Sequence, residues 1–173
     1  MLNTSKFFYF KRSIVIYLFI VFSLFYSMSG VAMSLFGTEV VLFPYMQGKL
    51  TYQGKPAAGA KIVRHIIWKD EDGEKEVFYA NENGDFDLPI KKDKLRIPML
   101  GEFVIAQQLS VTFYDTEYFI WYKGSSDFDK YSGLGGYLQN MRCEITDESV
   151  RINEFNALFT TSCKWDSIVK QGD

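Results

Sequence analysis

The residues best suited to chemistry in this chain are two cysteines, Cys143 and Cys163, and a single histidine, His65. A catalytic thiolate needs a base beside it. His65 lies far away in the sequence, and the letters "RCE" around Cys143 match no nucleophile motif. We therefore predict that the two cysteines form a structural disulfide. It would close a loop of about twenty residues and stabilise the fold by roughly 3 kcal/mol in the chain-entropy treatment.

Other chemical motifs are incomplete. One histidine and two distant cysteines cannot supply a zinc site. The acidic stretches "DEDGE" and "NENGD" place oxygen ligands around a glycine, but neither has the alternating ligands and final glutamate of a calcium loop. A Ser-His-Asp set would have to use His65, which lies within an apolar strand. The glycines of "SGLGGY" have no following lysine to hold a phosphate. We therefore predict no catalytic residue, no metal, no cofactor and no enzyme activity.

Strands, not helices, are expected to position these residues. The chain has 173 residues, of which 47% are hydrophobic and 17% aromatic. This composition suits one domain with flat side chains packed across sheets. Beyond residue 42, no apolar stripe with a 3.6-residue period reaches helical length. The sequence predicts a single all-β domain at residues 40–167.

Turn residues divide the first part of this domain into strands. "GKLTYQ" (48–53) reads as a strand and "GKPAAG" (54–59) as a turn, because proline lacks an amide donor and glycine accepts turn geometry. "AKIVRHIIW" (60–68) is largely apolar on both sides and is expected inside a sheet. The turns "DG" (72–73) and "NG" (83–84) then give four strands joined by two hairpins and one wider loop.

The second part contains a long hairpin and a long loop. The apolar strands at 103–114 and 118–124 are expected deep in the core, and residues 124–136 read as a mobile loop that could carry recognition. Strands at 137–145 and 150–165 complete the domain. If exposed, the aromatic residues of the hairpin and loop favour a protein or carbohydrate partner. These residues are Tyr114, Tyr118, Phe119, Trp121, Tyr122, Phe128, Tyr131 and Tyr137.

Residues 1–32 have the layout of a secretory signal. A basic flank precedes an uncharged apolar run, and Gly30 and Ala32 offer small side chains for cleavage after Ala32. The alternative is a membrane anchor at 13–33, which is long enough to span a bilayer. Either arrangement exports the rest of the chain. The expected location is periplasmic or secreted, or outside the cytoplasm on an anchor, where a disulfide persists.

The charge distribution excludes one class of partner. The whole chain has a net charge of -2. Removing residues 1–32 takes away three bases and no acids, which leaves about -5. An acidic domain has no electrostatic basis for holding nucleic acid or anionic lipid. We expect no nucleic-acid partner, and membrane contact only through an uncleaved N-terminal segment.

The two glycine-rich turns carry a resemblance. "YQGKPAAGAKI" and "YANENGDFDLP" resemble the signature of carboxypeptidase regulatory-like domains and their transthyretin-like and immunoglobulin-like relatives, over residues 46–90. The usual threonine before the second turn is absent, since Tyr79 and Ala80 stand there. The resemblance implies an immunoglobulin-like or transthyretin-like β-sandwich, preceded here by a hydrophobic signal helix, with a binding role and no chemistry of its own. The matching positions are Gly48, Gly54, Lys55, Pro56, Gly59, Ala60, Ile62, Asn83, Gly84 and Phe86.

We therefore expect an exported, non-enzymatic domain that recognises a protein partner in the cell envelope. One version is an immunity protein that neutralises an antibacterial effector. A structural or assembly accessory, whose sheet edge pairs with a neighbour, is the first alternative. A carbohydrate-binding module or a hydrolase is the other, and it requires a concave cluster of carboxylates or exposed aromatic rings.

Overall fold

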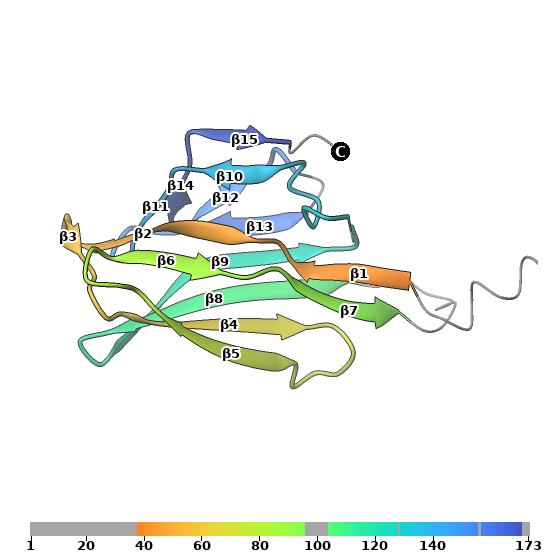
Figure 1. Ribbon diagram of the computed structural model, residues 1–173, viewed down its shortest axis with the longest axis horizontal. Helices are drawn as coiled ribbons and strands as arrows, with labels where there is room; N and C mark the ends of the chain where they lie inside the picture. The colour runs from red at the N-terminus through yellow and green to blue at the C-terminus, as the bar shows by residue number, and fades with distance from the viewer. Residues whose placement is uncertain (1–37, 96–103, 128, 156, 171–173) are drawn as a thin grey trace, which may run out of the picture. The chain divides into compact units, whose positions relative to one another are not determined.

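Every regular element in the described part of the chain is a β-strand (Figure 1). The structure, a computed structural model, describes residues 38–95, 104–127, 129–155 and 157–170. In these ranges we find no helix with the length and apolar character needed to cross a membrane. The predicted all-β class is confirmed, whereas the predicted signal segment at residues 1–32 lies outside the described residues.

The chain divides into two compact units. The larger unit comprises Glu39–Asp93 and Met99–Asp173, and it holds both of the larger sheets. The smaller unit comprises Met1–Thr38 and Lys94–Pro98. Of its residues, the structure describes Thr38, Lys94 and Leu95. All surfaces discussed below belong to the larger unit.

The larger sheet has six strands and is built around a long hairpin. Its strand order is β12 (Val150–Ile152), β13 (Leu158–Thr161), β9 (Thr116–Ser125), β8 (Ile105–Phe113), β4 (Lys61–Ile67) and β5 (Glu74–Tyr79). Strand β4 pairs with β8 on one side and β5 on the other. The predicted central strand is thus confirmed, as is the hairpin through Gly73, which has φ +63°.

The second sheet has five strands and is centred on β2. Its strands are β14 (Cys163–Lys164), β11 (Met141–Glu144), β2 (Met46–Tyr52), β3 (Lys55–Pro56) and β6 (Asp85–Leu88). Strand β11 runs parallel to β2, while β3 and β6 pair with it antiparallel. Two further strand pairs are β1 (Thr38–Phe43) with β7 (Lys91–Leu95), and β10 (Tyr137–Gln139) with β15 (Ser167–Val169).

The turn at Gly84 does not make the hairpin that the sequence predicts. The turn itself forms, since the Gly84 amide donates to the Asn81 carbonyl at 2.9 Å. Strand β6 nevertheless leaves the six-stranded sheet and pairs with β2 in the other sheet, not with β5. Gly84 has φ +79°, and a Cβ there would lie 2.4 Å from the Leu50 carbonyl oxygen. Glycine therefore permits both the turn and this close approach to β2.

Gly48 allows β6 to pack against β2. A Cβ at this position would lie 2.8 Å from the Met141 carbonyl oxygen and 2.9 Å from the Phe86 ring. Phe86 stands opposite Gly48 in the ladder and is almost fully buried. The aromatic ring thus takes the space that a side chain on β2 would otherwise fill.

Glu144 holds the turn between β2 and β3. The backbone amides of Gln53 and Gly54, both at positive φ, each donate to its carboxylate at 3.0 Å. Partial burial works to raise the pKa of Glu144, but hydrogen bonds from Thr146, Gly54 and Gln53 outweigh it and lower the pKa to about 2. The predicted turn at 54–59 is interrupted by the short strand β3, whose Lys55 and Pro56 pair with β2, so this part of the prediction was wrong. The carboxylate that holds the start of the turn lies far away in the sequence.

Arg64 on β4 is a charged side chain inside the domain. Its Nε donates to Glu76 Oε2 at 2.9 Å, and its Nη1 donates to the Pro89 carbonyl, which follows β6 of the other sheet. The guanidinium carbon lies 5.1 Å from the ring centroids of both Phe43 and Phe78. Arg64 therefore connects β4 with β5, β1 and the end of β6.

Within the segment 124–136, which the sequence predicts as a mobile loop, Ser132 is held by side chains of β8 and β9. Gln107 Nε2 donates to Ser132 Oγ at 2.6 Å, and Lys123 Nζ donates to the Ser132 carbonyl. Ser132, Tyr131 and Leu134 are all buried. The polar composition that is typical of mobile loops here satisfies buried polar groups of β8 and β9.

The buried ammonium of Lys123 makes stability depend on pH. Burial lowers the pKa of Lys123 to about 8, against the opposing attraction of Asp127 and Asp129. Between about pH 8 and the ordinary value of 10.5, the unfolded chain keeps a proton that the folded chain has released. The free energy of unfolding should therefore rise with pH across this window, with a slope of at most about 1.4 kcal/mol per pH unit.

Urea unfolding of the wild type and Lys123→Met at several pH values isolates this effect. Below pH 8 the wild type bears the full cost of burying the charge, so its stability relative to Lys123→Met should be lowest there and increase toward pH 10.5. Other groups titrate equally in both proteins. Parallel pH profiles for the two proteins would contradict the assignment.

Candidate binding surface

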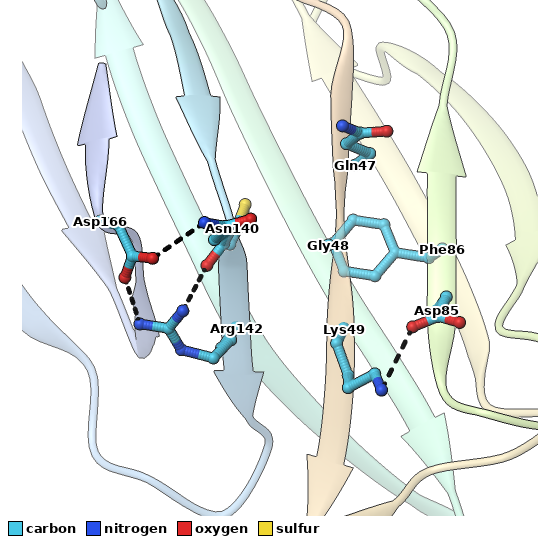
Figure 2. A pocket seen from close by; sticks show the side chains of 9 residues that line it. Gln47, Gly48, Lys49, Asp85, Phe86, Asn140, Arg142 and Asp166 are labelled. Atoms are coloured by element: carbon cyan, nitrogen blue, oxygen red, sulfur yellow. Dashed lines mark hydrogen bonds and ion pairs between the residues drawn. The ribbon is translucent and has the colours of Figure 1, made fainter. Parts of the chain in front are cut away.

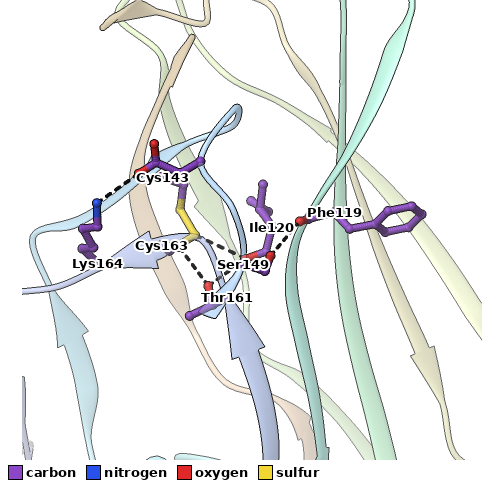
Figure 3. The surroundings of a disulfide bond; sticks show 8 residues. Phe119, Ile120, Cys143, Ser149, Thr161, Cys163 and Lys164 are labelled. Atoms are coloured by element: carbon purple, nitrogen blue, oxygen red, sulfur yellow. Dashed lines mark hydrogen bonds and ion pairs between the residues drawn. A yellow bond between two sulfur atoms is a disulfide. The ribbon is translucent and has the colours of Figure 1, made fainter. Parts of the chain in front are cut away.

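The disulfide lies where the chain passes between the two larger sheets (Figure 3). Cys143 on β11 and Cys163 on β14 are bonded, face each other in the ladder, and have Cα atoms 4.1 Å apart. Strand β13 of the six-stranded sheet ends at Thr161, and β14 of the other sheet begins at Cys163. Thr161 Oγ1 donates to the Ile120 carbonyl at 2.7 Å and accepts from the Cys163 amide at 3.0 Å. The Cys143–Cys163 disulfide predicted from the sequence is therefore present, and it links two neighbouring strands.

The other residues considered for chemistry stabilise turns. His65 Nε2 lies 2.8 Å from the Asp72 carbonyl oxygen, across the β4–β5 turn. In "DEDGE", Asp70 accepts from the Gly73 amide at 2.7 Å. In "NENGD", Asn81 Oδ1 accepts from the amides of Asn83 and Asp85, both at 2.9 Å. Within the described ranges, no group of three or more metal-ligating side chains is placed to hold an ion.

The outer face of the six-stranded sheet is the main candidate surface. Because side chains alternate across a strand, the ladder registers assign one set of residues to this face. One row across the sheet is Val77, Val63, Ser110 and Phe119, and the next is Lys75, His65, Gln108, Tyr122, Thr160 and Arg151. The row before these is Tyr79, Lys61, Thr112 and Glu117, and the row after them is Ile67, Ala106, Gly124 and Leu158. We call these residues the candidate interface.

Large apolar side chains are exposed on the candidate interface. Five of the nine exposed large hydrophobic residues in the described chain lie on it: Val77, Tyr79, Phe119, Tyr122 and Leu158. Tyr79 is 65% and Phe119 58% exposed. These five residues lie on β5, β9 and β13, and β4 and β8 stand between the first two of these strands. Isolated exposed apolar residues are normal, but several gathered on one sheet face favour an interaction site.

The charges on the candidate interface are mainly positive. Lys61, Lys75 and Arg151 occupy it, and Glu117, opposite Thr112 beside Lys61, is the acidic residue on that face. None of these three bases has an ion-pair partner within the part of the chain that the structure describes. An excess of unpaired cations on one face of an otherwise acidic domain favours an acidic partner.

The outer face of the five-stranded sheet has the opposite character. Its outward row is Asp85, Lys49, Arg142 and Lys164, all of them charged. Each has an ion-pair partner: Lys49 with Asp85, Arg142 with Asp166, and Lys164 with Asp147. Polar residues outside and apolar residues inside are the usual pattern of an antiparallel sheet face in water. The outer face of the six-stranded sheet, in contrast, exposes large apolar side chains. Of the two outer faces, only this one has an unusual composition in the described residues.

The aromatic residues of the β8–β9 hairpin fall into three environments. Trp121 is buried, with its ring centroid 4.4 Å from that of Phe159. Phe119 and Tyr122 point outward on the candidate interface, which corrects the prediction that the whole hairpin lies deep in the core. Tyr114, 75% exposed, and Tyr118 pack against Tyr52 at the hairpin tip, with ring centroids 5.6 Å and 6.3 Å away.

The loop aromatics lie elsewhere. Tyr131 is buried, and its ring centroid is 5.0 Å from that of the half-buried Tyr137. Phe128 lies outside the described residues. Neither tyrosine therefore belongs to the candidate interface.

A hollow is also present over β2 (Figure 2). It has a volume of about 460 Å³ and is lined by Gln47, Lys49, Asp85, Asn140, Arg142 and Asp166, among others. A second hollow of about 490 Å³ shares Gln47 and is lined by Tyr45, Tyr137 and Gln139. Sequence reasoning did not identify this region, because its residues come from five strands and the intervening turns.

Comparison with known proteins gives one match. The family model described as "Domain of unknown function (DUF6795)" matches residues 46–148. No curated protein and no solved structure matches the chain. The matched segment contains strands β2 to β11, and thus four of the six strands that carry the candidate interface.

Proposed function

The chain belongs to the family described as Domain of unknown function (DUF6795), whose description names no activity, and we propose a function for it from its surface. It is an exported, non-enzymatic domain that binds a protein partner in the cell envelope through the candidate interface. The observation that carries the proposal is the exposed apolar face of the six-stranded sheet, with Tyr79, Phe119 and Tyr122 upon it.

We also propose that the fold is an immunoglobulin-like β-sandwich of the carboxypeptidase regulatory-like or transthyretin-like kind. Two larger sheets of five and six strands support this assignment, as do the turns at Gly54, Gly59 and Gly84, all at positive φ. A rigid sheet holds its outward side chains in fixed positions, so little ordering entropy is lost when a partner binds.

Export is supported by two features. Residues 1–32 have the sequence of a signal, and the Cys143–Cys163 disulfide is of a kind that persists in an oxidising compartment. These features support our proposal that the domain lies in the periplasm or outside the cell, with the N-terminal segment cleaved or retained as an anchor. A binding role for an immunity protein, with a toxic effector as the partner, is one version of this function.

The partner's surface should be apolar with flanking carboxylates. Aromatic rings such as Phe119 and Tyr122 supply large contact area at small entropic cost and are frequent binding hot spots. Three basic residues lie on the same face as these rings: Lys61 on β4, Lys75 on β5 and Arg151 on β12. Their long-range attraction would speed the encounter with an acidic partner and fix its orientation.

Assembly by strand pairing is the weaker alternative. Strand β5 is an edge of the six-stranded sheet, so its outer backbone groups are available to a neighbouring strand. It begins with Glu74, Lys75 and Glu76, and charged residues of this kind protect sheet edges from pairing. The edge therefore favours a partner held by side chains on the face.

Photo-crosslinking in the cells that produce the chain tests the proposed surface. Benzoylphenylalanine in place of Tyr79 or Phe119 should yield an adduct with one envelope protein. The same group in place of Lys164, on the outward row of the five-stranded sheet, is the matched control and should not. Adding Phe119→Asp to the Tyr79 probe should weaken capture by about thirtyfold, because about 2 kcal/mol is typical of an aromatic hot spot.

Three outcomes would count against the proposal. Equal adducts from both faces would show that the candidate interface is not selective. An adduct of the chain with itself would identify a second copy as the occupant. If the domain is folded and no adduct forms at Tyr79, Phe119 or Tyr122, the proposed binding function is contradicted.

A further inference from the structure

We propose that the two hollows over β2 form a second binding site, for a neutral oligosaccharide. They adjoin at Gln47 of β2: the first lies on the five-stranded sheet, and the second lies between β2 and the β10–β15 pair. Neither is lined by a residue of the candidate interface. Each has a volume within the range of small-molecule sites, roughly 300–1,000 Å³. The site combines paired charges, side-chain amides that keep unused hydrogen-bonding groups, and tyrosine rings, which together match the chemistry of a sugar chain.

The charged groups of the first hollow cancel one another (Figure 2). Arg142 Nη2 lies 2.6 Å from Asp166 Oδ1, and Lys49 Nζ lies 3.5 Å from Asp85 Oδ1. Asn140 Nδ2 also donates to Asp166 Oδ2 at 2.9 Å. Two bases and two acids leave no net charge to attract an ion. The carboxylates, held in place, remain good acceptors for hydroxyl groups.

Side-chain amides supply both donors and acceptors. The side-chain amide of Gln139 and Nε2 of Gln47 have no hydrogen-bond partner within the described residues, whereas Gln47 Oε1 lies 3.1 Å from the Tyr45 hydroxyl. A primary amide can donate to one hydroxyl and accept from its neighbour. Adjacent hydroxyl groups on a sugar ring present this alternation, whereas an apolar ligand would leave the amides unpaired.

Two tyrosines form the wall at the other end. The rings of Tyr45 and Tyr137 meet edge to face, with centroids 6.3 Å apart. The Tyr45 hydroxyl donates to Asp87 Oδ2 at 2.8 Å, which fixes the position of its ring. An aromatic face offers an apolar surface to the C–H groups of a pyranose ring, while the hydroxyls remain directed to polar groups.

The backbone beneath the first hollow argues against a peptide in extended form there. A peptide that adds to a sheet needs unpaired backbone groups on an edge strand. Strand β2 is paired with β11 on one side and with β6 and β3 on the other. A ligand above β2 can therefore be held by side chains alone, which suits a hydroxyl-rich molecule.

A printed array of neutral and acidic oligosaccharides, followed by calorimetric titration of the full chain, tests the site. At least one neutral trisaccharide should bind with a dissociation constant below about 1 mM. Gln47→Ala and Gln139→Ala should each weaken binding by about tenfold. Gln108→Ala, the same change on the candidate interface, is the matched control and should leave sugar binding unchanged.

The variants also separate this site from the proposed protein partner. Phe119→Asp should reduce partner capture and leave sugar binding intact, while Gln47→Ala should do the reverse. The inference is overturned if no neutral sugar binds at a concentration of about 10 mM, which is roughly ten times the largest dissociation constant that we expect. It is equally overturned by tighter binding of acidic sugars, or by neutral-sugar binding that survives Gln47→Ala with Gln139→Ala.

Discussion

Replacing Arg64 by alanine is expected to lower the free energy of unfolding by about 4 kcal/mol. Arg64 is 1% exposed, and its loss would leave the half-buried Glu76 carboxylate and the Pro89 carbonyl without their main donor. Breaking a buried charged pair by removing one partner costs about 3–5 kcal/mol. The change also removes the cation that lies between the rings of Phe43 and Phe78. Urea unfolding followed by tryptophan fluorescence measures the loss.

Two further variants assign the cause of this loss. Arg64→Lys keeps the charge but not the planar fork, so it should recover a minor part of the stability. Arg64→Met with Glu76→Gln should lose less than Arg64→Met alone, because no unpaired carboxylate then remains. A loss below about 1 kcal/mol for Arg64→Ala would show that Lys91, whose Nζ lies 3.2 Å from Glu76 Oε1, is sufficient.

Acid should remove part of the Arg64 contribution. Burial works to raise the pKa of Glu76, but hydrogen bonds and charge attraction from Arg64 and Lys91 outweigh it, and the pKa is lowered. The stability that comes from this lowered pKa is present above the ordinary value of 4.5 and is lost as the pH falls through the folded value. Glu76→Gln should therefore show a smaller loss of stability in acid than the wild type.

Removing the disulfide is expected to cost about 3 kcal/mol. The bond joins residues 20 positions apart, and closing a loop of this length lowers the entropy of the unfolded chain by an amount worth about 3 kcal/mol. The double variant Cys143→Ala with Cys163→Ala removes the bond with little change in buried apolar surface. Its urea midpoint should match that of the reduced wild type.

The control for this prediction replaces the same two residues by serine. Both positions are almost fully buried, so two hydroxyl groups should destabilise the domain further than two methyl groups. If the oxidised wild type and the alanine double variant unfold at the same urea concentration, the bond does not stabilise the fold.

Local turn chemistry could be read from the sequence. Gly54, Gly59 and Gly73 all adopt positive φ, and β4 lies inside its sheet as its apolar residues predict. These features depend on residues within a few positions of one another. The direction taken after a turn does not, and the strand after Gly84 goes to the other sheet because β2 supplies Gly48 as the place where Phe86 packs.

The candidate interface could not be found in this way. A strand that is apolar on both faces is normally read as buried on both faces, and β9 has such a sequence. Which face of β9 meets the core depends on the ladder and on the bulge between Leu109 and Ser110 of β8. The hydrogen bonds from Gln107 and Lys123 to Ser132 could not be predicted from the sequence either, because the loop's own residues do not show which strand residues will contact it.

The parallel pairing of β2 with β11 has a consequence for the order of folding. Leu50 stands opposite Cys143, so the two partners are separated by more than half of the chain. Contacts of such high contact order form late and slow the folding rate, since a long segment must be confined first. During synthesis, which starts at the N-terminus, β2 cannot gain its parallel partner until β11 has emerged, and the sheet is complete only after β14. Until β11 pairs with it, one edge of β2 stays unpaired, and an unpaired strand edge favours aggregation.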